Sequence, residues 1–501
     1  MFIKESISRY KKKKYINASI VCGYRDENKK VKLKTIFNLG QVKDDSDREK
    51  NRRILEEIKQ GETLIKIKDL NFQNQSDFGL IYCIKQVLKN NNFLKIIENI
   101  FGKKKNYVKL FFHLISNRLS NPKSDLEFTK WLQKHTFDRI STTEVYRFLT
   151  FLYEKKGMIE DMTFQYLKEK KFVKAKIVFI DLTSSYFESS ISEIAKYGYS
   201  RDKRKDKKQI VIALVMMDNL HIASYVFEGN TQDKQTLEQI AEELKQRFGI
   251  AKCVVVADKG LLSNNNIILL NDHNFQYILA AKRRGLNQEE KIFFTKAEHL
   301  EEKNIDNKRY FVFVNNQRRK QELDRLDQIV LKINESLQTK KSIKTLCVQF
   351  GKSSRLINFE TRKINQETLD YEKAIAGKYM VMTNTDLSPS EAIKQYKQLQ
   401  EIERCFRELK SFVNVRPMWH RKKENIVSHV FICVFALLIK RLIEKQQKGC
   451  FESLTEIKAA KLEIKNQAYF LLNDVYQEKQ LCFRKIGLVP LPKMIALDKV
   501  N

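Results

Sequence analysis

The sequence has few of the residues that cross-link or rigidify secreted and metal-stabilised proteins. Its 501 residues include 8 Cys, 5 Pro and 2 Trp. The cysteines, at 22, 83, 253, 347, 405, 433, 450 and 482, are scattered and form no CxxC pair. This spacing argues against a zinc ribbon and against a disulfide framework, and it fits a reducing cytosol. The 7 His show no HxxxH or HExxH spacing, so no histidine-based metal motif is predicted.

Signals for nucleotide binding and for membranes are also missing. The chain contains no GxxxxGK[ST] run, so we expect no nucleotide cofactor. The basic first residues are not followed by an apolar segment and do not form a signal peptide. The most apolar run, residues 430–439, is too short to span a bilayer and predicts a buried helix. We therefore expect a cytoplasmic protein with no membrane partner.

Acidic residues are much scarcer than basic ones. The chain has 94 Lys and Arg against 61 Asp and Glu, a formal net charge of +33. Nucleic acid is the usual partner of such a protein, because basic side chains displace counterions from phosphates. An anionic membrane surface is the alternative partner. An AT-rich genome would also raise the Lys content without any such partner.

The pattern of apolar residues divides the chain into several parts. We predict a β-hairpin and helix in 1–70, a helical region in 71–173, a core of strands and helices in 174–274 and 386–445, a β-rich insertion in 275–385, and a helical region in 446–501. Residues 71–173 could grip DNA or form an ordinary helical bundle. The last part could serve dimerisation. In the insertion, strands are expected at FQYILAAKR, KRYFVFVNNQ, SIKTLCVQF and GKYMVMTNT, with one helix over 320–338.

The core begins with apolar strands that end in acidic residues. KAKIVFID ends at Asp181 and CVVVADKG contains Asp258, while a hairpin over 209–228 and an amphipathic helix over 234–250 lie between them. Fully apolar strands indicate a sheet that is covered on both faces. Asp181 and Asp258 are therefore expected side by side at the ends of neighbouring strands.

A third carboxylate lies on a predicted helix that starts at SPSEAIK. Ser388 is a candidate N-cap with Glu391 at the capping-box spacing, and Glu403, Arg407 and Lys410 follow along the helix. Converging carboxylates bind hard divalent cations. A pair of such ions can activate a water or a 3′-hydroxyl for phosphodiester chemistry. Asp181, Asp258 and Glu403 are thus predicted to bind two Mg²⁺ ions, with Mn²⁺ as a substitute. Taken singly, each acid could be a turn, cap or surface residue.

Several ordered blocks resemble those of a known family. They are DLTSSYFES (181–189), YGYSRDKRKDKKQI (197–210), FEGNTQD (227–233), VVVADKGLLSNNNI (254–267), YKQLQEIERCFRELKS (396–411) and NLG (38–40). They resemble DDE transposases of bacterial insertion sequences. The resemblance implies an α/β fold with a ribonuclease-H-like core, split by a β-rich insertion between the second Asp and the Glu.

The resemblance also implies roles for individual residues. Asp181, Asp258 and Glu403 match the catalytic triad, and the motif Tyr-x2-Arg-x3-Glu-x6-Lys falls on Tyr396, Glu403 and Lys410. One position departs from the motif, because its Arg corresponds to Leu399. Arg404 or Arg407 is the expected substitute for that phosphate contact.

A second departure concerns tryptophan. Trp131 and Trp419 both lie outside the insertion, where some relatives stack a flipped base on Trp. Tyr310, Phe311 or Phe313 is the possible substitute.

Other basic and polar residues are predicted to contact DNA. They are Arg201, Lys203 and Arg204 in RDKRKDKK, Asn230 in GNTQD, and Arg416, Trp419 and Arg421 in RPMWHRKKEN. Each segment also has a plainer interpretation. RDKRKDKK could be a solvated loop, Gly-Asn in GNTQD could form a turn, and RPMWHRKKEN could be a linker between helices. His420 and His429 are expected to be structural.

The leading functional hypothesis is a transposase that binds terminal inverted repeats, cuts at the element ends and joins the 3′-hydroxyl to target DNA. Such an enzyme acts on double-stranded DNA as a homodimer. The alternatives are a catalytically silent or domesticated DNA-binding descendant and another ribonuclease-H-like nuclease, since a fold alone does not fix a function.

Overall fold

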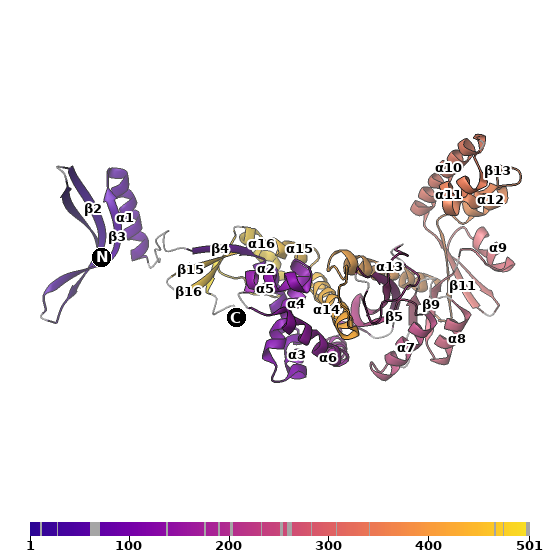
Figure 1. The fold of residues 1–501 in the computed structure, drawn as a ribbon, viewed down its shortest axis with the longest axis horizontal. Coiled ribbons are helices and arrows are strands. Elements are labelled where there is room, and N and C mark those ends of the chain that lie inside the picture. Colours follow the sequence, from indigo (N-terminus) through magenta and orange to yellow (C-terminus); the bar gives the residue numbers. More distant parts are fainter. Residues whose placement is uncertain are drawn as a thin grey trace. The chain divides into compact units, whose positions relative to one another are not determined.

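The computed structural model describes residues 1–10, 13–27, 29–60, 71–136, 139–174, 177–188, 191–200, 204–231, 233–250, 254–257, 263–281, 283–306, 308–339, 341–464, 467–473 and 475–496. The chain forms two compact units. The first comprises Met1–Asn74, Ala460–Leu471 and Pro492–Asn501, and the second comprises Gln75–Ala459 and Leu472–Leu491. Figure 1 labels their helices and strands.

The first unit begins with a three-stranded antiparallel sheet and a helix. The elements are β1 (Phe2–Tyr10), β2 (Lys13–Arg25), β3 (Val31–Val42) and α1 (Asp45–Lys59), with the strands in the order β1-β2-β3. The predicted hairpin is confirmed as β2 and β3. The strand β1 was not predicted, because its Ser, Lys and Glu residues give little apolar signal.

The C-terminal segment was predicted to be helical, and this is wrong in part. It contains α15 (Cys450–Thr455), β15 (Ala459–Ile464), β16 (Gln467–Leu472), α16 (Val475–Lys485) and β17 (Met494–Ala496). Three of these strands form a four-stranded sheet with β4 (Asn71–Ser76), in the order β17-β16-β15-β4. Strand pairing with a segment almost 400 residues away overrides a weak local preference for helix.

The predicted helical region consists of five helices after β4. They are α2 (Phe78–Asn90), α3 (Phe93–Phe101), α4 (Lys105–Ser120), α5 (Asp125–Thr136) and α6 (Thr142–Glu169). Helices α2, α4 and α6 pack on α14 (Lys423–Gln446). The ring centroids of Phe111 and Phe435 are 5.3 Å apart in this core. These helices therefore form one hydrophobic core with α14.

The centre of the second unit is an eight-stranded mixed sheet with the order β10-β11-β14-β9-β8-β5-β6-β7. The strands are β5 (Ile177–Tyr186), β6 (Gln209–Met217), β7 (Leu220–Glu228), β8 (Val254–Ala257), β9 (Gln276–Ala280), β10 (Glu301–Ile305), β11 (Lys308–Val314) and β14 (Lys378–Thr383). Strands β5, β6 and β7 are antiparallel, while β8 is parallel to β5 and β9 is parallel to β8. The predicted α/β fold is confirmed.

Local chemistry explains the turn between β6 and β7. Asp218 and Asn219 have φ values of 47° and 65°, in the left-handed region that Asp and Asn tolerate best among residues with a side chain. Two such residues in a row form the type I′ turn that suits a two-residue hairpin. This hairpin was predicted from the sequence and is confirmed.

Helices cover the sheet. Helix α13 (Pro389–Ser411) packs on β5, β8 and β9, and α14 packs on β7. Figure 1 shows α7 (Asp233–Gln246) and α8 (Asn264–Asp272) on the side of the sheet away from α13. All nine residues of β6 are buried, as the apolar sequence predicted.

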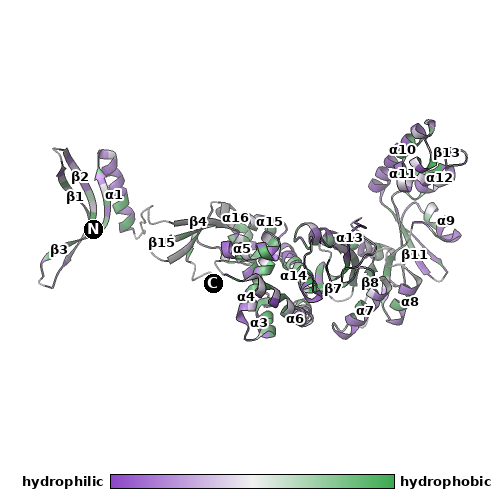
Figure 2. Ribbon diagram, viewed as in Figure 1, coloured by the Kyte–Doolittle hydropathy of each residue, from purple (hydrophilic) through white to green (hydrophobic). Residues whose placement is uncertain are grey.

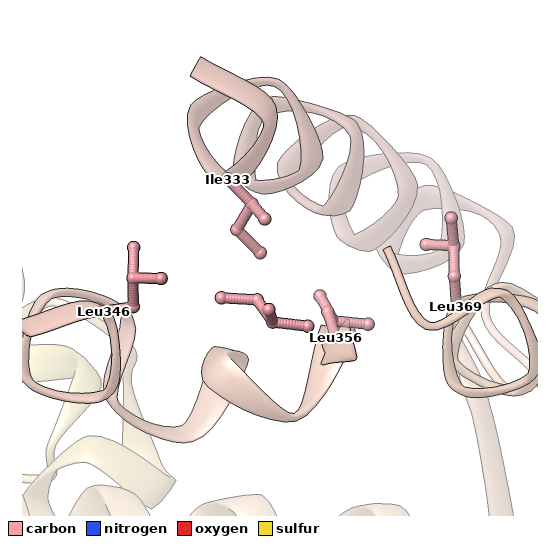
Figure 3. Packing of buried hydrophobic residues seen from close by; sticks show 5 residues of the cluster. Ile333, Leu346, Leu356 and Leu369 are labelled. Carbon is pink, nitrogen blue, oxygen red and sulfur yellow. The ribbon is translucent and has the colours of Figure 1, made fainter. Parts of the chain in front are cut away.

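The insertion extends the core sheet and then forms a helical lobe. Strands β14, β11 and β10 continue the sheet beyond β9 in antiparallel pairs. The lobe contains α10 (Asn316–Gln338), α11 (Ile343–Phe350), the 3₁₀ helix η3 (Gly351–Leu356) and α12 (Gln366–Ala374), while α9 (Gln288–Lys296) precedes it and β12 (Ile357–Asn358) and β13 (Lys363–Ile364) form a small hairpin. Figure 3 shows Ile333, Leu346, Leu356 and Leu369 pointing towards one another at its centre.

The predicted strand SIKTLCVQF is wrong, because these residues form α11. Ser342 accepts a hydrogen bond from the amide of Thr345 and caps the helix. Leu346 is the buried residue of the helix, whereas Val348 is 80% exposed. Short apolar runs do not separate helix from strand by period alone, and here the N-cap decides.

Helix α14 is long and apolar. Among the described residues, α14 is long and apolar enough to cross a membrane, since an 18-residue stretch of it has a mean hydropathy of 2.2. However, 94% of that stretch is buried inside the fold. Figure 2 shows green, hydrophobic residues along α14 and the neighbouring strands. The prediction of a buried helix over 430–439 is confirmed.

We predict that acid weakens this core through His221. Burial, together with the charge of Arg441, lowers the pKa of His221 to about 3. Since the unfolded chain protonates its histidines below about pH 6.5, stability is complete above that pH and falls as pH drops towards the folded value. Both ring nitrogens of His221 lack a hydrogen-bond partner among the described residues. His221→Leu should therefore reduce the loss of melting temperature between about pH 7 and about pH 5. Equal losses in the two proteins, followed by circular dichroism, would contradict this.

Candidate active site

Asp181 lies in the middle of a strand and not at its end. Strand β5 continues to Tyr186, which pairs with Gln209 of β6. The prediction of a strand-end carboxylate is corrected in this respect, because SerSerTyr after Asp181 maintains the pairing. On the other side of β5 the parallel pairing with β8 stops at Phe179 and Val256. Asp181 therefore lies just beyond the point where β8 ends, half-buried, and its Oδ1 accepts a hydrogen bond of 2.7 Å from the amide of Leu182.

Three predicted site residues fall outside the part of the chain that the structure describes. They are Asp258, Arg201 and Lys203. In the sequence Asp258 directly follows Ala257, the last residue of β8. The residues two positions after the paired Phe179 and Val256 are thus the two predicted aspartates.

Helix α13 begins where the sequence predicted. Ser388 and Glu391 form a capping box, and Pro389 occupies the first turn. Its buried side includes Leu399, Ile402 and Phe406, which pack towards the sheet. Helix α13, which carries Glu403, packs on β5, the strand of Asp181, and on β8.

Glu401 and Glu408, the acidic neighbours of Glu403 on α13, form ion pairs with α14. Glu408 bonds to Lys440 at 2.9 Å and to Arg441 at 3.3 Å, and Glu401 bonds to Arg441 at 3.1 Å. Glu403, in contrast, is exposed. The Arg404 side chain pairs with Glu408 at 3.6 Å. The glutamates at 401 and 408 are thus committed to the fold, and Glu403 is the carboxylate on the exposed side of this part of α13.

An arginine of the insertion lies near Glu403. The hydrogen bond to Glu322, at 3.0 Å, and the charges of Glu322 and Glu403 raise the pKa of Arg318. Arg318 also lies 5.9 Å from the ring centroid of Tyr379. Sequence reasoning missed Arg318, since it lies 85 residues before Glu403 in the chain.

Aromatic rings connect this arginine to α13. The Tyr379 ring stacks on Phe313 with a centroid distance of 5.0 Å, and Phe313 lies 6.2 Å from Tyr396. Leu399, which replaces the Arg of the motif, is 4% exposed and packs in the core. Arg318 of α10 is thus connected to α13 through Tyr379, Phe313 and Tyr396.

Arg407 and Lys410 remain on α13 with different exposures. Arg407 is exposed, while Lys410 is half-buried near the end of the helix. Both lie beyond Glu403 on the helix. Their places permit contact with a bound phosphate chain along α13.

Two predicted DNA-contacting arginines meet at one tyrosine. Arg204 and Arg416 each lie 5.2 Å from the ring centroid of Tyr186, at the end of β5. Arg204 donates to both oxygens of Asp206, at 2.9 and 2.7 Å, and this pair lowers the pKa of Asp206 to about 2. Sequence reasoning missed Tyr186, although it lies inside the block that contains Asp181. The two segments 204–208 and 416–418 thus meet at the same strand end.

Glycines hold the neighbouring loops together. A Cβ at Gly198 would overlap the carbonyl oxygen of Gly229, and one at Gly229 would overlap the carbonyl oxygen of Gln209. The exposed Asn230 directly follows this contact. Close approach of two backbones explains the glycines in YGYS and EGN. The contact fixes the loop of Asn230 next to the loop that precedes Arg204.

Trp419 projects from a well-fixed segment. Its side chain is 58% exposed, whereas its neighbours Met418 and His420 are 0% and 8% exposed. Met418 also forms a bridge with Phe187, next to Tyr186. Arg421 is exposed two residues further on. An exposed indole between two buried residues is held in place and can stack on a base.

A buried polar cluster holds the segment of Arg416 and Trp419 in place. Asp125, His420 and His429 each offer a ligand atom, and these atoms lie within 4.8 Å of one another. Burial lowers the pKa of both histidines, and the Arg118 charge adds to this for His429. Neutral histidines fit two of the hydrogen bonds in the cluster. Nε2 of His429 donates to the carbonyl of Val415 at 3.3 Å, and Nε2 of His420 donates to Nδ1 of His429 at 3.2 Å.

The cluster does not fit a metal ion. The guanidinium of Arg118 lies 3.7 Å from Asp125 and 3.5 Å from Nδ1 of His429. It already supplies the positive charge that a dication would bring, and it would repel one. The cluster therefore joins α4 and α5 to the segment of Arg416 and Trp419, in agreement with the structural role expected for both histidines.

Comparisons with known proteins identify the family. Residues 173–439, more than half of the chain, match the family described as Transposase DDE domain. The chain is a DDE transposase. Residues 3–65 match the N-terminal domain of IS1634 family transposases. The transposase core thus spans β5 to α14, and the domain matched at the start covers β1 to α1.

Solved structures give weaker similarities. The transposase resembles the piggyBac transposase in a synaptic complex with hairpin DNA, with 11% identity, 83% coverage of this chain, 82% of that chain and a TM-score of 0.37. It also resembles the Mos1 transposase in a paired-end complex with the left transposon end, with 12% identity, 31% and 54% coverage and a TM-score of 0.16. No curated protein matches the sequence.

We predict that the glycine contact beside Asn230 is essential for stability. Gly198→Ala should lower the free energy of unfolding by about 1–3 kcal/mol, because two backbones must separate. Gly157→Ala is the control, since its Cβ would meet only Arg247 at 3.7 Å and helix interiors favour Ala by about 0.5–1 kcal/mol. Urea denaturation of both variants measures the difference. A Gly198→Ala protein as stable as the wild type would show that the loops are not in contact.

Proposed function

We propose that this transposase binds the terminal inverted repeats of its own insertion sequence, cleaves DNA at the element ends and joins the new 3′-hydroxyl to target DNA. The observation behind this proposal is the position of Glu403. It is an exposed carboxylate in the second half of a helix that packs on β5 and β8, while its neighbours Glu401 and Glu408 are bound to α14. A carboxylate left exposed beside a strand with another carboxylate suits metal-dependent phosphoryl chemistry.

We infer that Asp181, Asp258 and Glu403 hold divalent metal ions, Mg²⁺ or Mn²⁺. The donors are carboxylate oxygens, which hard cations prefer. Two such ions would polarise the scissile phosphate and lower the pKa of the attacking water or 3′-hydroxyl. Helix α13 would set the position of Glu403 relative to β5, and the buried side of the helix keeps that position fixed.

We infer that DNA runs along the side of the core where the basic and aromatic residues gather. Arg204, Arg416, Trp419, Arg421 and Asn230 would contact it beyond β5, together with Arg201 and Lys203, which precede Arg204 in the sequence. Tyr396, Arg407 and Lys410 would contact the DNA along α13. Arg404 would also contact it, although its side chain forms an ion pair with Glu408. Tyr186 would orient Arg204 and Arg416, since a ring between two guanidiniums limits the motion of both.

We also propose that the enzyme works as a homodimer on DNA in the bacterial cytoplasm. The functional division of the chain would be 1–70, 71–173, the core in 174–274 and 386–445, the insertion in 275–385, and 446–501. The early helices share the α14 core.

The first test is cleavage of a labelled duplex that carries the repeat flanking the gene. Cutting at the repeat boundary should require Mg²⁺ or Mn²⁺. The cleavage rate should fall at least about 1,000-fold in Glu403→Gln, because the variant lacks one metal ligand. The affinity of Glu403→Gln for the duplex in EDTA should be unchanged. Glu401→Gln, two residues away, should lower the melting temperature through its lost ion pair and retain metal-dependent cutting. Cutting that survives Glu403→Gln would exclude Glu403 from the metal site.

A second test concerns Arg318. Arg318→Gln should lower the cleavage rate about 10–100-fold, the loss of one charge-assisted hydrogen bond to a phosphate, while the affinity for the same duplex in EDTA changes less. Arg325→Gln, exposed on the same helix, removes an equal charge and serves as the control. Equal effects of the two variants would show that Arg318 contributes only general charge.

A further inference from the structure

The two faces of the N-terminal sheet differ sharply in their side chains. The register places Ile3 opposite Ile20 and Ile20 opposite Phe37, and it places Ile7 opposite Ile16 and Ile16 opposite Val42. These residues share one face, since neighbours across a ladder point the same way. Ala18 and Ile20 on this face are 0% exposed. Glu5, between Ile3 and Ile7, bonds to Arg48 of α1 at 3.1 Å, so this is the face that α1 covers.

The opposite face is polar over three consecutive ladder positions. Lys4 is opposite Ser19, which is opposite Asn38; Ser6 is opposite Asn17, which is opposite Gln41; and Ser8 is opposite Tyr15. Lys4, Asn38 and Gln41 are exposed. The described residues of these three rows include no acidic side chain, whereas in the next row Phe2 is opposite Val21, which is buried. Any half-covered sheet has a polar outer face, but a face of amides, hydroxyls and a lysine without one carboxylate is unusual in a chain with 61 acidic residues.

Positive charge flanks this face at both ends. Residues 1–43 contain 12 Lys and Arg and three Asp and Glu. Of the three acids, Glu5 points to α1, and Asp26 is occupied by Lys32 at 3.1 Å. Arg25, Lys30 and Lys34 are exposed around the turn between β2 and β3. In the sequence, Lys11 and Lys12 come between β1 and β2, and Lys13 and Lys14 are the first residues of β2. These basic residues would attract DNA phosphates at both ends of the sheet.

The dimensions and chemistry match the major groove of DNA. Three strands at about 4.8 Å spacing have a backbone width of about 10 Å, and the groove is about 12 Å wide and admits β-ribbons. Asn and Gln pair with the N6 and N7 edge of adenine, and Lys pairs with the O6 and N7 edge of guanine. Such side chains select a base sequence, whereas the flanking lysines bind phosphate without selection.

We propose that the face of Lys4, Asn17, Asn38 and Gln41 reads base edges in the major groove of the terminal repeat. This inference rests on the proposed function, because it assumes that the protein binds that repeat. It assigns sequence recognition to the β1–β3 sheet, whereas the predicted DNA-binding region of 71–173 would bind without base selection.

The test compares two double variants of the full-length protein. Lys4→Ala/Gln41→Ala changes the proposed reading face, and Lys50→Ala/Gln60→Ala removes the same two side-chain types from exposed positions at α1. Binding is measured in EDTA, on the duplex with the repeat that flanks the gene and on an unrelated duplex of equal length. We expect the first variant to lose about 10-fold or more of its preference for the repeat, as each base contact contributes about 1–3 kcal/mol. The second should weaken binding to both duplexes equally.

A modified duplex tests the groove directly. Replacing the repeat purines by 7-deazapurines removes the N7 acceptors of the major groove and leaves the minor groove unchanged. This should weaken the wild type at least about 10-fold and should affect Lys4→Ala/Gln41→Ala much less. Matching circular dichroism melts show that both variants are folded.

The outcomes separate the two proposals. If the variant retains the full preference for the repeat, or if the 7-deaza repeat binds the wild type normally, the sheet does not read the groove, although repeat binding stands. If the wild type shows no preference for the repeat at all, the proposed function fails and this inference fails with it.

Discussion

The attachment of α13 to α14 determines the rotation of the helix that presents Glu403. Successive residues of an α-helix are about 100° apart. Glu401 and Glu408 are therefore on nearly the same side, and both bond to Arg441. Glu403 is about 200° from Glu401 and faces away from α14. A helix rotated by even one residue would lose both ion pairs and would turn Glu403 from the exposed surface.

These ion pairs are better understood as orienting contacts than as sources of stability. The side chains of Glu408, Lys440 and Arg441 are 14%, 9% and 13% exposed, so their desolvation offsets much of the attraction between them. An apolar interface would hold α13 and α14 at least as firmly. It would not penalise a wrong rotation as strongly, because only a specific rotation pairs every buried charge.

The sequence was most informative where structure is local. The capping box of Ser388, the turn at Asp218 and Asn219 and the apolar strand β6 each follow from a few adjacent residues. Arg318, Tyr186 and the polar cluster of Asp125 were not predicted, because each depends on segments more than a dozen residues apart. The error at α11 has a different cause, since five apolar residues in nine fit either period. Asp181 was placed at a strand end because polar residues after it resemble a turn, yet they pair with β6.

The insertion is continuous with the core sheet, and this explains how it can contribute to the active site. Strand β14 pairs with β9 and β11 pairs with β14, so hydrogen bonds of the sheet lead from the core strands to the start of α10. Arg318 is in the first turn of α10, and Glu322, which bonds to it, also accepts from the amide of Gly377 just before β14. A separate domain on a flexible linker could not hold a guanidinium near Glu403 in this way. The sheet therefore fixes where Arg318 lies, whereas Leu399 of α13 is buried and apolar.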